Sequence, residues 1–255
     1  MIHRTALVDP TARLGNDVSV GPYAIIGPRV SIGDHSSVAG HAVLERNTRV
    51  GSDVKIGYGV VIGSDPQDLK YKGEETWVEV GDKTVLREYC TVNRGTTSTG
   101  KTAIGARCFL MSYVHVAHDC VLGDDVIIAN HVQMGGHVTI EDRAIIGGLV
   151  AIHQFVRVGK LAFLGGASRV NQDVPPFTKA AGNPVHLYGL NSVGLARAGF
   201  SPEVKLALKR AYRLLFNSEH TVTQGIVRAR AELDRVAEVA YFLQFIEGSQ
   251  RGVLV

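Results

Sequence analysis

Aliphatic residues return every six positions along the first two thirds of this chain. The residue after each is very often glycine, and the fourth residue on is small or β-branched. Side chains alternate between the two faces of a strand, so the small residue and the next aliphatic residue point the same way. Each hexapeptide can therefore form one flat side and one corner of a prism, and we expect glycine to supply the backbone angles of the corner. The aliphatic series comprises Ile2, Val8, Leu14, Val20, Ile26, Ile32, Val38, Leu44, Val50, Ile56, Ile62, Val80, Leu86, Val92, Ile104, Leu110, Val116, Leu122, Ile128, Met134, Ile140, Ile146, Ile152, Val158, Leu164 and Val170.

Three such sides make one turn of about 18 residues, and turns stack at the strand spacing of about 4.8 Å. The repeat therefore predicts a parallel β-helix, although periodicity alone does not give its hand. Cys90, Cys108 and Cys120 share one position of the hexapeptide. We expect them to lie in the core as reduced thiols, without a disulfide framework.

The repeat is interrupted twice. Residues 64–79 contain a polar stretch bounded by proline and glycine, and residues 93–101 are rich in glycine and threonine. Both segments are predicted to leave the prism as external loops. Loops held by a rigid scaffold are where functional sites are usually built.

The C-terminal part of the chain has a different pattern. The repeat stops at Val174, and residues 201–203 combine a hydroxyl cap, a proline and an acid, which is typical of a helix start. Further helices are predicted at 223–236 and 237–247. We therefore predict a β-helix over residues 1–185 and a small α-helical domain over 186–255, which covers an end of the β-helix or packs on a neighbouring molecule.

Composition narrows the class of protein. The chain has 255 residues and a net charge of +3, which does not suggest a nucleic-acid binder but is compatible with an acidic protein partner or an anionic substrate. The repeat begins at Ile2, so no signal peptide is expected, and the longest apolar runs are too short for stable membrane insertion. We expect a cytoplasmic protein.

Histidines gather at one predicted corner. The hexapeptides that begin at Val116, Met134 and Ile152 are 18 residues apart, so they should stack on successive turns. We predict that His118, His137 and His153 form a solvent-facing column there. Imidazole side chains at corner positions do not contribute to packing of the apolar core. Gly136, Gln154 and, one strand residue earlier, His115 lie beside this column.

Two chemistries fit such a column. A zinc site of the carbonic anhydrase kind is disfavoured, because those enzymes have a His-x4-His pair that this chain lacks. General-base catalysis on a hydroxyl suits a neutral histidine near pH 7. Asp119 could orient His118, and a backbone N–H near Gly136 could stabilise an oxyanion. No serine or cysteine stands in a convincing nucleophile setting, so direct transfer is favoured over an acyl-enzyme.

Four short motifs, taken in their order along the chain, resemble those of a known family. They closely resemble the UDP-N-acetylglucosamine O-acyltransferases, hexapeptide-repeat enzymes of the first step of lipid A biosynthesis, and the resemblance covers essentially the whole chain. The motifs are residues 67–74 (QDLKYKGE), 115–120 (HVAHDC), 152–155 (IHQF) and 172–176 (QDVPP).

The resemblance implies a left-handed β-helix, a homotrimer and active sites between subunits. The implied reaction moves a 3-hydroxyacyl chain from acyl carrier protein to the glucosamine 3-hydroxyl of UDP-N-acetylglucosamine, with no cofactor and no metal. His118 matches the general base, Asp119 its partner and Gly136 the oxyanion position. Gly166 matches a position that limits acyl length, where a small residue suggests a long chain. Matched substrate-binding positions are Asp68, Lys70, His115, His137, Gln154, Asn191 and Arg197, with His153 beside them.

Some features leave alternatives open. Val193 and Pro184 stand where some members have a glutamate and a histidine, so the nucleotide contacts and the acyl length stay open at this point. The acceptor could be a 3-amino analogue, which would give an amide. Two other classes of protein are disfavoured. The related N-acyltransferase of the same pathway has an extra N-terminal domain before its repeats, whereas the repeat here starts at residue 2. An ice-binding scaffold would need a flat array of threonines, which this sequence lacks. Arg143, Arg157, Lys160, Arg169 and Lys179 could form a carrier-docking surface, or they could be ordinary solvated surface charges.

Overall fold

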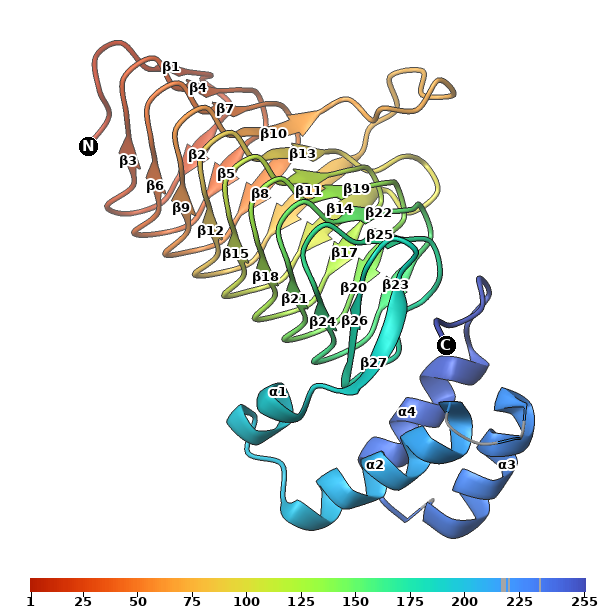
Figure 1. Ribbon diagram of the computed structural model, residues 1–255. Helices are drawn as coiled ribbons and strands as arrows, with labels where there is room; N and C mark the ends of the chain where they lie inside the picture. Colours follow the sequence, from red (N-terminus) through yellow and green to blue (C-terminus); the bar gives the residue numbers. More distant parts are fainter. Residues whose placement is uncertain (217–218, 220, 234) are drawn as a thin grey trace.

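Three sheets, whose strands are parallel except for the last pair of the third sheet, form the sides of a long prism, with helices gathered at its C-terminal end (Figure 1). The protein is seen here in a computed structural model that describes residues 1–216, 219, 221–233 and 235–255. The chain visits the first, second and third sheet in turn, which confirms the predicted parallel β-helix.

Most strands contain only two residues, the second of which points into the core. The first sheet contains β1 (Leu7–Val8), β4 (Ile25–Ile26), β7 (Val43–Leu44), β10 (Val61–Ser64), β13 (Thr91–Asn93), β16 (His115–Val116), β19 (Gln133–Met134), β22 (Ala151–Ile152) and β25 (Arg169–Val170). The second contains β2 (Arg13–Leu14), β5 (Ser31–Ile32), β8 (Thr48–Val50), β11 (Trp77–Val80), β14 (Lys101–Ile104), β17 (Val121–Leu122), β20 (Thr139–Ile140) and β23 (Arg157–Val158). The third contains β3 (Ser19–Val20), β6 (Ser37–Val38), β9 (Lys55–Ile56), β12 (Val85–Leu86), β15 (Phe109–Leu110), β18 (Ile127–Ile128), β21 (Ile145–Ile146), β24 (Phe163–Leu164), β26 (Thr178–Ala181) and β27 (His186–Leu190).

The pairing register confirms the predicted 18-residue turn. Leu110 pairs with Ile128, one turn further along the chain. The offset rises to 30 residues between Ile62 and Val92, across the first loop, and to 24 between Val80 and Ile104, across the second. Both additions are multiples of six, so the aliphatic phase survives both loops.

The core is a continuous column of aliphatic side chains, as predicted. The three cysteines belong to it as buried free thiols. Burial raises the pKa of Cys90 and Cys108 to about 11 and that of Cys120 to about 12. Thiols this buried remain protonated near neutral pH and are poor nucleophiles.

Glycine serves the corners differently from the way we predicted. The left-handed backbone angles fall mostly on other residues, such as Asp17 (φ 54°) and Tyr23 (φ 58°), three positions after an aliphatic residue. At Gly21 and Gly81, a Cβ atom would lie 2.6 Å from a backbone nitrogen of the next turn. The prediction about corner angles was therefore wrong, and these glycines allow successive turns to approach closely.

The last strands and the helices close the C-terminal end of the prism. The expected boundary at residue 185 falls inside an antiparallel hairpin, because β27 pairs with β26. The helices are α1 (Ser192–Arg197), α2 (Pro202–Phe216), α3 (Val222–Leu233) and α4 (Ala237–Glu247). The backbone N–H of Val204 donates to Ser201 Oγ at 3.3 Å, which confirms the predicted cap of α2. The predicted helices at 223–236 and 237–247 correspond to α3 and α4, with residue 234 outside the described range.

A second apolar cluster joins the helices to the prism. Leu161 and Phe177 from the β-helix pack with side chains of α2, α3 and α4. The helical region thus covers the end of the solenoid, one of the two positions that we expected for it. No helix in the described part of the chain has the length and apolar character needed to cross a bilayer.

Candidate active site

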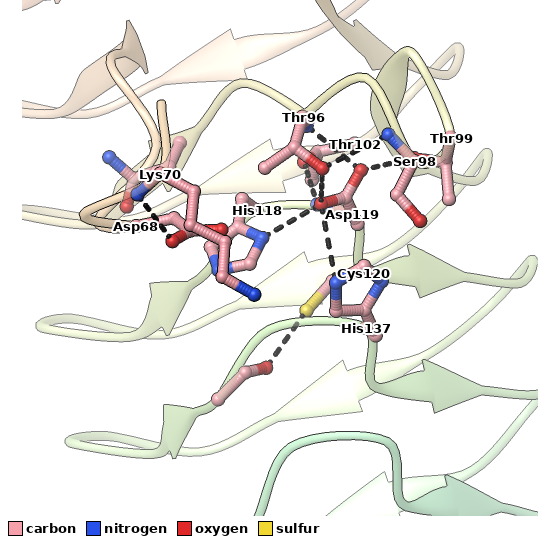
Figure 2. A network of polar contacts seen from close by, with 12 residues as sticks. Asp68, Lys70, Thr96, Ser98, Thr99, Thr102, His118, Asp119, Cys120 and His137 are labelled. Atoms are coloured by element: carbon pink, nitrogen blue, oxygen red, sulfur yellow. Dashed lines mark hydrogen bonds and ion pairs between the residues drawn. The ribbon is translucent and has the colours of Figure 1, made fainter. Parts of the chain in front are cut away.

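His118 and Asp119 lie at the corner between β16 of the first sheet and β17 of the second. Asp119 adopts the left-handed conformation of the corner, with φ 62°. His118 Nδ1 lies 2.7 Å from Asp119 Oδ2 (Figure 2). The Asp119 side chain has no exposed surface, whereas the His118 side chain is 13% exposed. The pair therefore joins a buried carboxylate to an imidazole that reaches the surface.

The second loop holds the carboxylate of Asp119. The backbone N–H of Thr96 and its hydroxyl donate to Asp119 at 2.9 and 2.8 Å, and the Thr99 hydroxyl also donates to it. Behind them, the N–H of Asp119 donates to Thr102 Oγ1 at 2.8 Å. Burial acts to raise the pKa of Asp119, but the hydrogen bonds from Thr99, His118 and Thr96 outweigh it, so this pKa lies below its usual value.

This arrangement sets the tautomer of His118. An ionised carboxylate only accepts hydrogen bonds, so His118 Nδ1 must be the protonated nitrogen when the ring is neutral. Its other nitrogen, Nε2, makes no hydrogen bond within the described residues. Nε2 is therefore free to accept a proton from a bound hydroxyl group.

Gly136 lies against the His118 ring from the next turn. A Cβ atom at this position would come within 2.6 Å of His118 Nε2, so only glycine leaves room for the ring. The N–H of Gly136 makes no hydrogen bond in the described part of the chain, whereas the N–H of Ala106, at the equivalent corner position of another hexapeptide, donates to Asp124 at 2.8 Å. A free backbone donor beside the base suits an oxyanion.

The three histidines do not form the predicted column in register. His118, His137 and His153 occupy three different positions of their hexapeptides. The His137 ring meets the His118 ring edge-on, with centroids 5.2 Å apart, and stacks on Phe155 at 4.6 Å. His153 is exposed, and its Nδ1 lies 3.0 Å from the carbonyl oxygen of Gln154. The structure thus brings two of these histidines to the dyad and leaves the third at the surface.

His115 lies on the outer face of the first sheet, next to this corner. Its Nδ1 is 2.8 Å from Thr91 Oγ1 on the adjacent strand. Burial lowers the pKa of His115, and the nearby charge of His118 lowers it further. His115 is therefore expected to remain neutral at pH 7, where it can donate or accept a hydrogen bond.

The donor set at this corner includes possible metal ligands. The ligand atoms of His118, Asp119 and His137 lie within 4.8 Å of one another. Asp119 Oδ2 is 3.6 Å from His137 Nε2, but the 2.7 Å between His118 and Asp119 is the length of a charge-assisted hydrogen bond. The geometry favours proton transfer over coordination of an ion.

Asp68 and Lys70 extend from the first loop, between β10 and β11. The backbone N–H of Lys70 donates to Asp68 Oδ1 at 2.9 Å. Among the described residues, neither side chain hydrogen-bonds to His118. In the view of Figure 2, these two residues approach the dyad from the left, with Thr96 above it and Thr99 to its right.

Asn191 and Arg197 lie on a different face of the chain. They line a cavity of about 400 Å³ with Val193 and with outward residues of β18, β21, β24 and β26, all from the third sheet. The Asn191 side chain also caps α1, because its Oδ1 accepts a hydrogen bond from the Gly194 N–H at 3.0 Å. Its Nδ2 donates to the Leu161 carbonyl oxygen at 2.9 Å, which joins α1 to the β-helix. The corner between the first two sides of a three-sided prism lies opposite the third side. One chain therefore does not bring Asn191 and Arg197 to His118.

Gly166 lies at the corner between the third and first sheets, across the first sheet from the dyad. A Cβ atom there would come within 3.1 Å of the Gly148 carbonyl oxygen on the preceding turn. Gln154, which is exposed, follows β22 at the same corner as His118. The predicted site residues thus occupy two corners, the outer face of the first sheet between them, one loop and one distant face.

Comparison with known proteins identifies the family. Residues 173–254 match the family model for domain 2 of UDP N-acetylglucosamine O-acyltransferase, and residues 11–46 and 101–136 match the bacterial transferase hexapeptide model. An acyl-(acyl-carrier-protein)-UDP-N-acetylglucosamine O-acyltransferase from Sulfurihydrogenibium sp. is 54% identical over 253 residues, which cover 99% of this chain and 93% of the relative. The chain belongs to the UDP-N-acetylglucosamine O-acyltransferase family. The resemblance stated from the four motifs is confirmed.

Other members of the O-acyltransferase family match over the full chain. A relative from Thiobacillus denitrificans is 46% identical, covering 99% of this chain and 98% of its own. The crystal structure of the UDP-N-acetylglucosamine acyltransferase from Bacteroides fragilis superposes with a TM-score of 0.98 at 38% identity, covering 100% of both chains. The fold is therefore the left-handed parallel β-helix with a small helical region that the resemblance implied.

The basic residues considered for carrier docking occupy more than one face of this O-acyltransferase chain. Arg169, Arg157 and Lys179 belong to strands of the first, second and third sheet respectively. Arg157 also lies 4.2 Å above the Phe245 ring, packed against α4. Arg143 and Lys160 lie at the corner between the second and third sheets, so four of the five residues surround this corner and Arg169 lies on another face. The docking role of these residues stays a hypothesis.

Sequence reasoning missed the residues that support the dyad. Thr96, Thr99 and Thr102 come from or flank the second loop, which we predicted only as a loop, and Phe155 supports His137. The high threonine content of this loop was the available signal. It could not show which hydroxyl groups would reach Asp119, because that depends on how the loop folds back on the next turn.

Proposed function

We propose that this chain transfers a 3-hydroxyacyl group from acyl carrier protein to the 3-hydroxyl of the glucosamine ring in UDP-N-acetylglucosamine. This is the reaction that begins lipid A biosynthesis. Family membership over the full chain supports the substrates. The observation that carries the chemistry is the His118 ring, held by Asp119 on one side and lying against Gly136 on the other.

In the proposed step, His118 Nε2 takes the proton from the sugar 3-hydroxyl as its oxygen attacks the thioester carbonyl. The negative charge that develops on the carbonyl oxygen is stabilised by the N–H of Gly136. The tetrahedral intermediate collapses, the carbon–sulfur bond breaks, and the imidazolium returns its proton to the departing thiolate. The products are an ester and the free carrier thiol. Asp119 remains ionised throughout and stabilises the imidazolium.

Direct transfer is supported by the state of the cysteines. Cys120 follows the dyad in sequence, but burial raises its pKa to about 12 and its Sγ donates to the Gly135 carbonyl oxygen at 3.3 Å. It is therefore a poor candidate for an acyl-enzyme nucleophile. The thioester is already activated, so the step needs neither a cofactor nor a metal.

The placement of the binding residues supports an oligomer. Asp68, Lys70 and His118 lie on one side of the chain, and Arg197 lines a cavity on the opposite side. We infer that each active site forms between two chains, with Asn191 and Arg197 of one chain binding the nucleotide end of a substrate that reaches His118 of another. A closed ring of three chains, the homotrimer implied by the family, satisfies this requirement with equivalent contacts.

The other matched residues take supporting parts in this proposal. His115, His137 and Gln154 line the sugar and acyl site beside the base, and His153 lies at its rim. The buried reduced cysteines are consistent with action in the cytoplasm. The acyl chain runs across the first sheet towards Gly166.

The proposal is tested by incubating the protein with 3-hydroxyacyl carrier proteins of several lengths and UDP-N-acetylglucosamine, and identifying the product by mass spectrometry. An ester at the sugar 3-position is expected. Parallel reactions with the 3-amino analogue test the acceptor. Transfer only to the amine would contradict the O-acyltransferase assignment for this chain.

A further inference from the structure

Arg94 is a fully buried arginine that the proposed reaction does not use. It follows β13 at the start of the second loop, and its side chain has no exposed surface. Arginine cannot lose its charge in a protein, so burial of its guanidinium requires several hydrogen-bond acceptors. The partners of Arg94 therefore indicate what this side chain does.

All three side-chain partners of Arg94 belong to the first loop or to the residue that introduces it. The guanidinium donates to the carbonyl oxygen of Gly63, to the carboxylate of Asp65 and, at 2.9 Å, to the hydroxyl of Tyr71. The Tyr71 hydroxyl in turn donates to the Glu74 carbonyl at 3.0 Å. Arg94 thus contacts the beginning of the loop and, through Tyr71, its far half.

Those contacts surround the residues assigned to substrate binding. Asp68 and Lys70 lie between Asp65 and Tyr71 in sequence, and the N–H of Tyr71 donates to the Asp68 carbonyl at 3.0 Å. Among the described residues, Asp68 and Lys70 make no hydrogen bond or ion pair to the body of the β-helix. Their positions depend on the segments on either side of them, which Arg94 holds.

The same short segment also supports the base. Thr96, two residues after Arg94, donates two hydrogen bonds to Asp119. The N–H of Arg94 donates to the Ser64 carbonyl at 2.9 Å, and Asn93 Nδ2 donates to the Asp65 carbonyl at 2.7 Å. Residues 93–99 therefore touch both the first loop and the dyad.

We propose that Arg94 is a positioning residue that fixes the first loop, and with it Asp68 and Lys70, relative to the His118–Asp119 pair. This inference rests on the proposed function. The Arg94 side chain has no exposed surface, so it would act through the loop and not directly on the substrate. Its planar fork serves three acceptors in different directions, a geometry that the single ammonium group of lysine cannot reproduce.

Steady-state kinetics of Arg94→Lys and Tyr71→Phe test this role. We expect Arg94→Lys to raise the KM for UDP-N-acetylglucosamine about tenfold while kcat changes much less, as when binding shared by ground and transition state is lost. Tyr71→Phe should give a smaller rise of the same kind. The acid limb of the pH profile, which reports protonation of the base, should stay in place, because the His118–Asp119 pair is untouched.

A double variant distinguishes positioning from general destabilisation. Once Lys70→Ala has removed a side chain that the loop presents, Arg94→Lys should raise KM by clearly less than it does alone. Arg230→Lys is the matched control, since Arg230 is a half-exposed arginine of α3 that pairs with Glu247 of α4, away from both loops. It should leave KM unchanged.

Limited trypsin digestion reports on the loop without any activity. Tyr71→Phe should be cut faster after Lys70 and Lys72 than wild type, at equal thermal stability. An unchanged KM together with unchanged cleavage in Tyr71→Phe would overturn the inference, including when Arg94→Lys fails to fold. If the wild-type protein transfers no acyl group but Tyr71→Phe is still cut faster than wild type, the proposed function is refuted. The role of Arg94 in holding the first loop is then retained.

Discussion

The imidazole of His118 lies 2.7 Å from the carboxylate of Asp119, its neighbour in sequence. Adjacent residues of a strand point to opposite faces, but this pair follows β16 and Asp119 has the left-handed φ of 62°. The corner therefore lets two consecutive side chains meet. The second loop holds the Asp119 carboxylate in the interior, while the His118 ring reaches the surface. Asp119 can therefore stabilise the imidazolium without itself meeting the substrate.

The hydroxyl of Thr99 should matter to stability at neutral pH more than in acid. The pKa of Asp119 is lower in the folded state than in the unfolded chain, where it is about 3.9. Ionised Asp119 therefore contributes to the free energy of unfolding above that pH, and the contribution is lost as the pH falls through the pKa of the folded state. Thr99→Val should lower the free energy of unfolding by about 1–3 kcal/mol at pH 7, the cost of a hydrogen bond to a charged group.

Urea denaturation at fixed protein concentration, at pH 7 and towards pH 3, measures this difference. The gap between Thr99→Val and wild type should shrink in acid. Thr97→Val is the control, because Thr97 is an exposed residue of the same loop whose hydroxyl makes no hydrogen bond within the described residues. A gap that is equal at both pH values would disprove the link to Asp119 ionisation.

Two adjacent glycines should differ in how much stability is lost when a single methyl group is added. A Cβ at Gly147 would lie 2.5 Å from the Gly166 backbone nitrogen, whereas one at Gly148 would lie 3.3 Å from the Asn130 carbonyl oxygen. Gly147→Ala should therefore destabilise the fold by about 1–3 kcal/mol, as overpacking does. Gly148→Ala should cost much less. Thermal denaturation of the two variants measures the difference, and equal losses would contradict close packing of turns as the reason for glycine.

Side-chain size at Gly166 should change the acyl length that is accepted. Gly166→Met adds a long side chain at the corner across the first sheet from the base, where even a Cβ would lie 3.1 Å from the Gly148 carbonyl oxygen. We expect the preferred 3-hydroxyacyl chain to become shorter by several carbons, with Gly166→Ala intermediate. Competition between carrier proteins loaded with different chains measures the preference. An unchanged preference would move the end of the acyl site away from Gly166.

The six-residue period was enough to predict most of this fold. Aliphatic residues such as Leu110 and Ile128 stack where the period places them, because a solenoid turn buries its apolar side only against its neighbours. The cap at Ser201 also followed from local chemistry. Helix α1 was missed because its six residues carry no apolar stripe, and its cap, Asn191, depends on a contact with Leu161 that is distant in sequence.

The site was predicted in part. Stacking by 18 residues brought His118 and Gly136 together correctly, since both lie two residues after their aliphatic position. The same reasoning failed for His153, which lies one residue after its aliphatic position, whereas His118 lies two residues after its own. At a corner, this difference of one residue points the side chain in a different direction. The partners of Asp119 could not be predicted, because Thr96 and Thr99 reach it only through the fold of an irregular loop.

The central claim is that His118 is the general base of acyl transfer. The decisive measurement is kcat for transfer of a 3-hydroxyacyl group from carrier protein to UDP-N-acetylglucosamine in wild type and His118→Ala, with His35→Ala as an exposed-histidine control. Removal of a general base should lower kcat at least about 100-fold with little change in KM, and the control should retain full activity. A His118→Ala enzyme that keeps kcat close to that of wild type would contradict the account and assign the base to another residue.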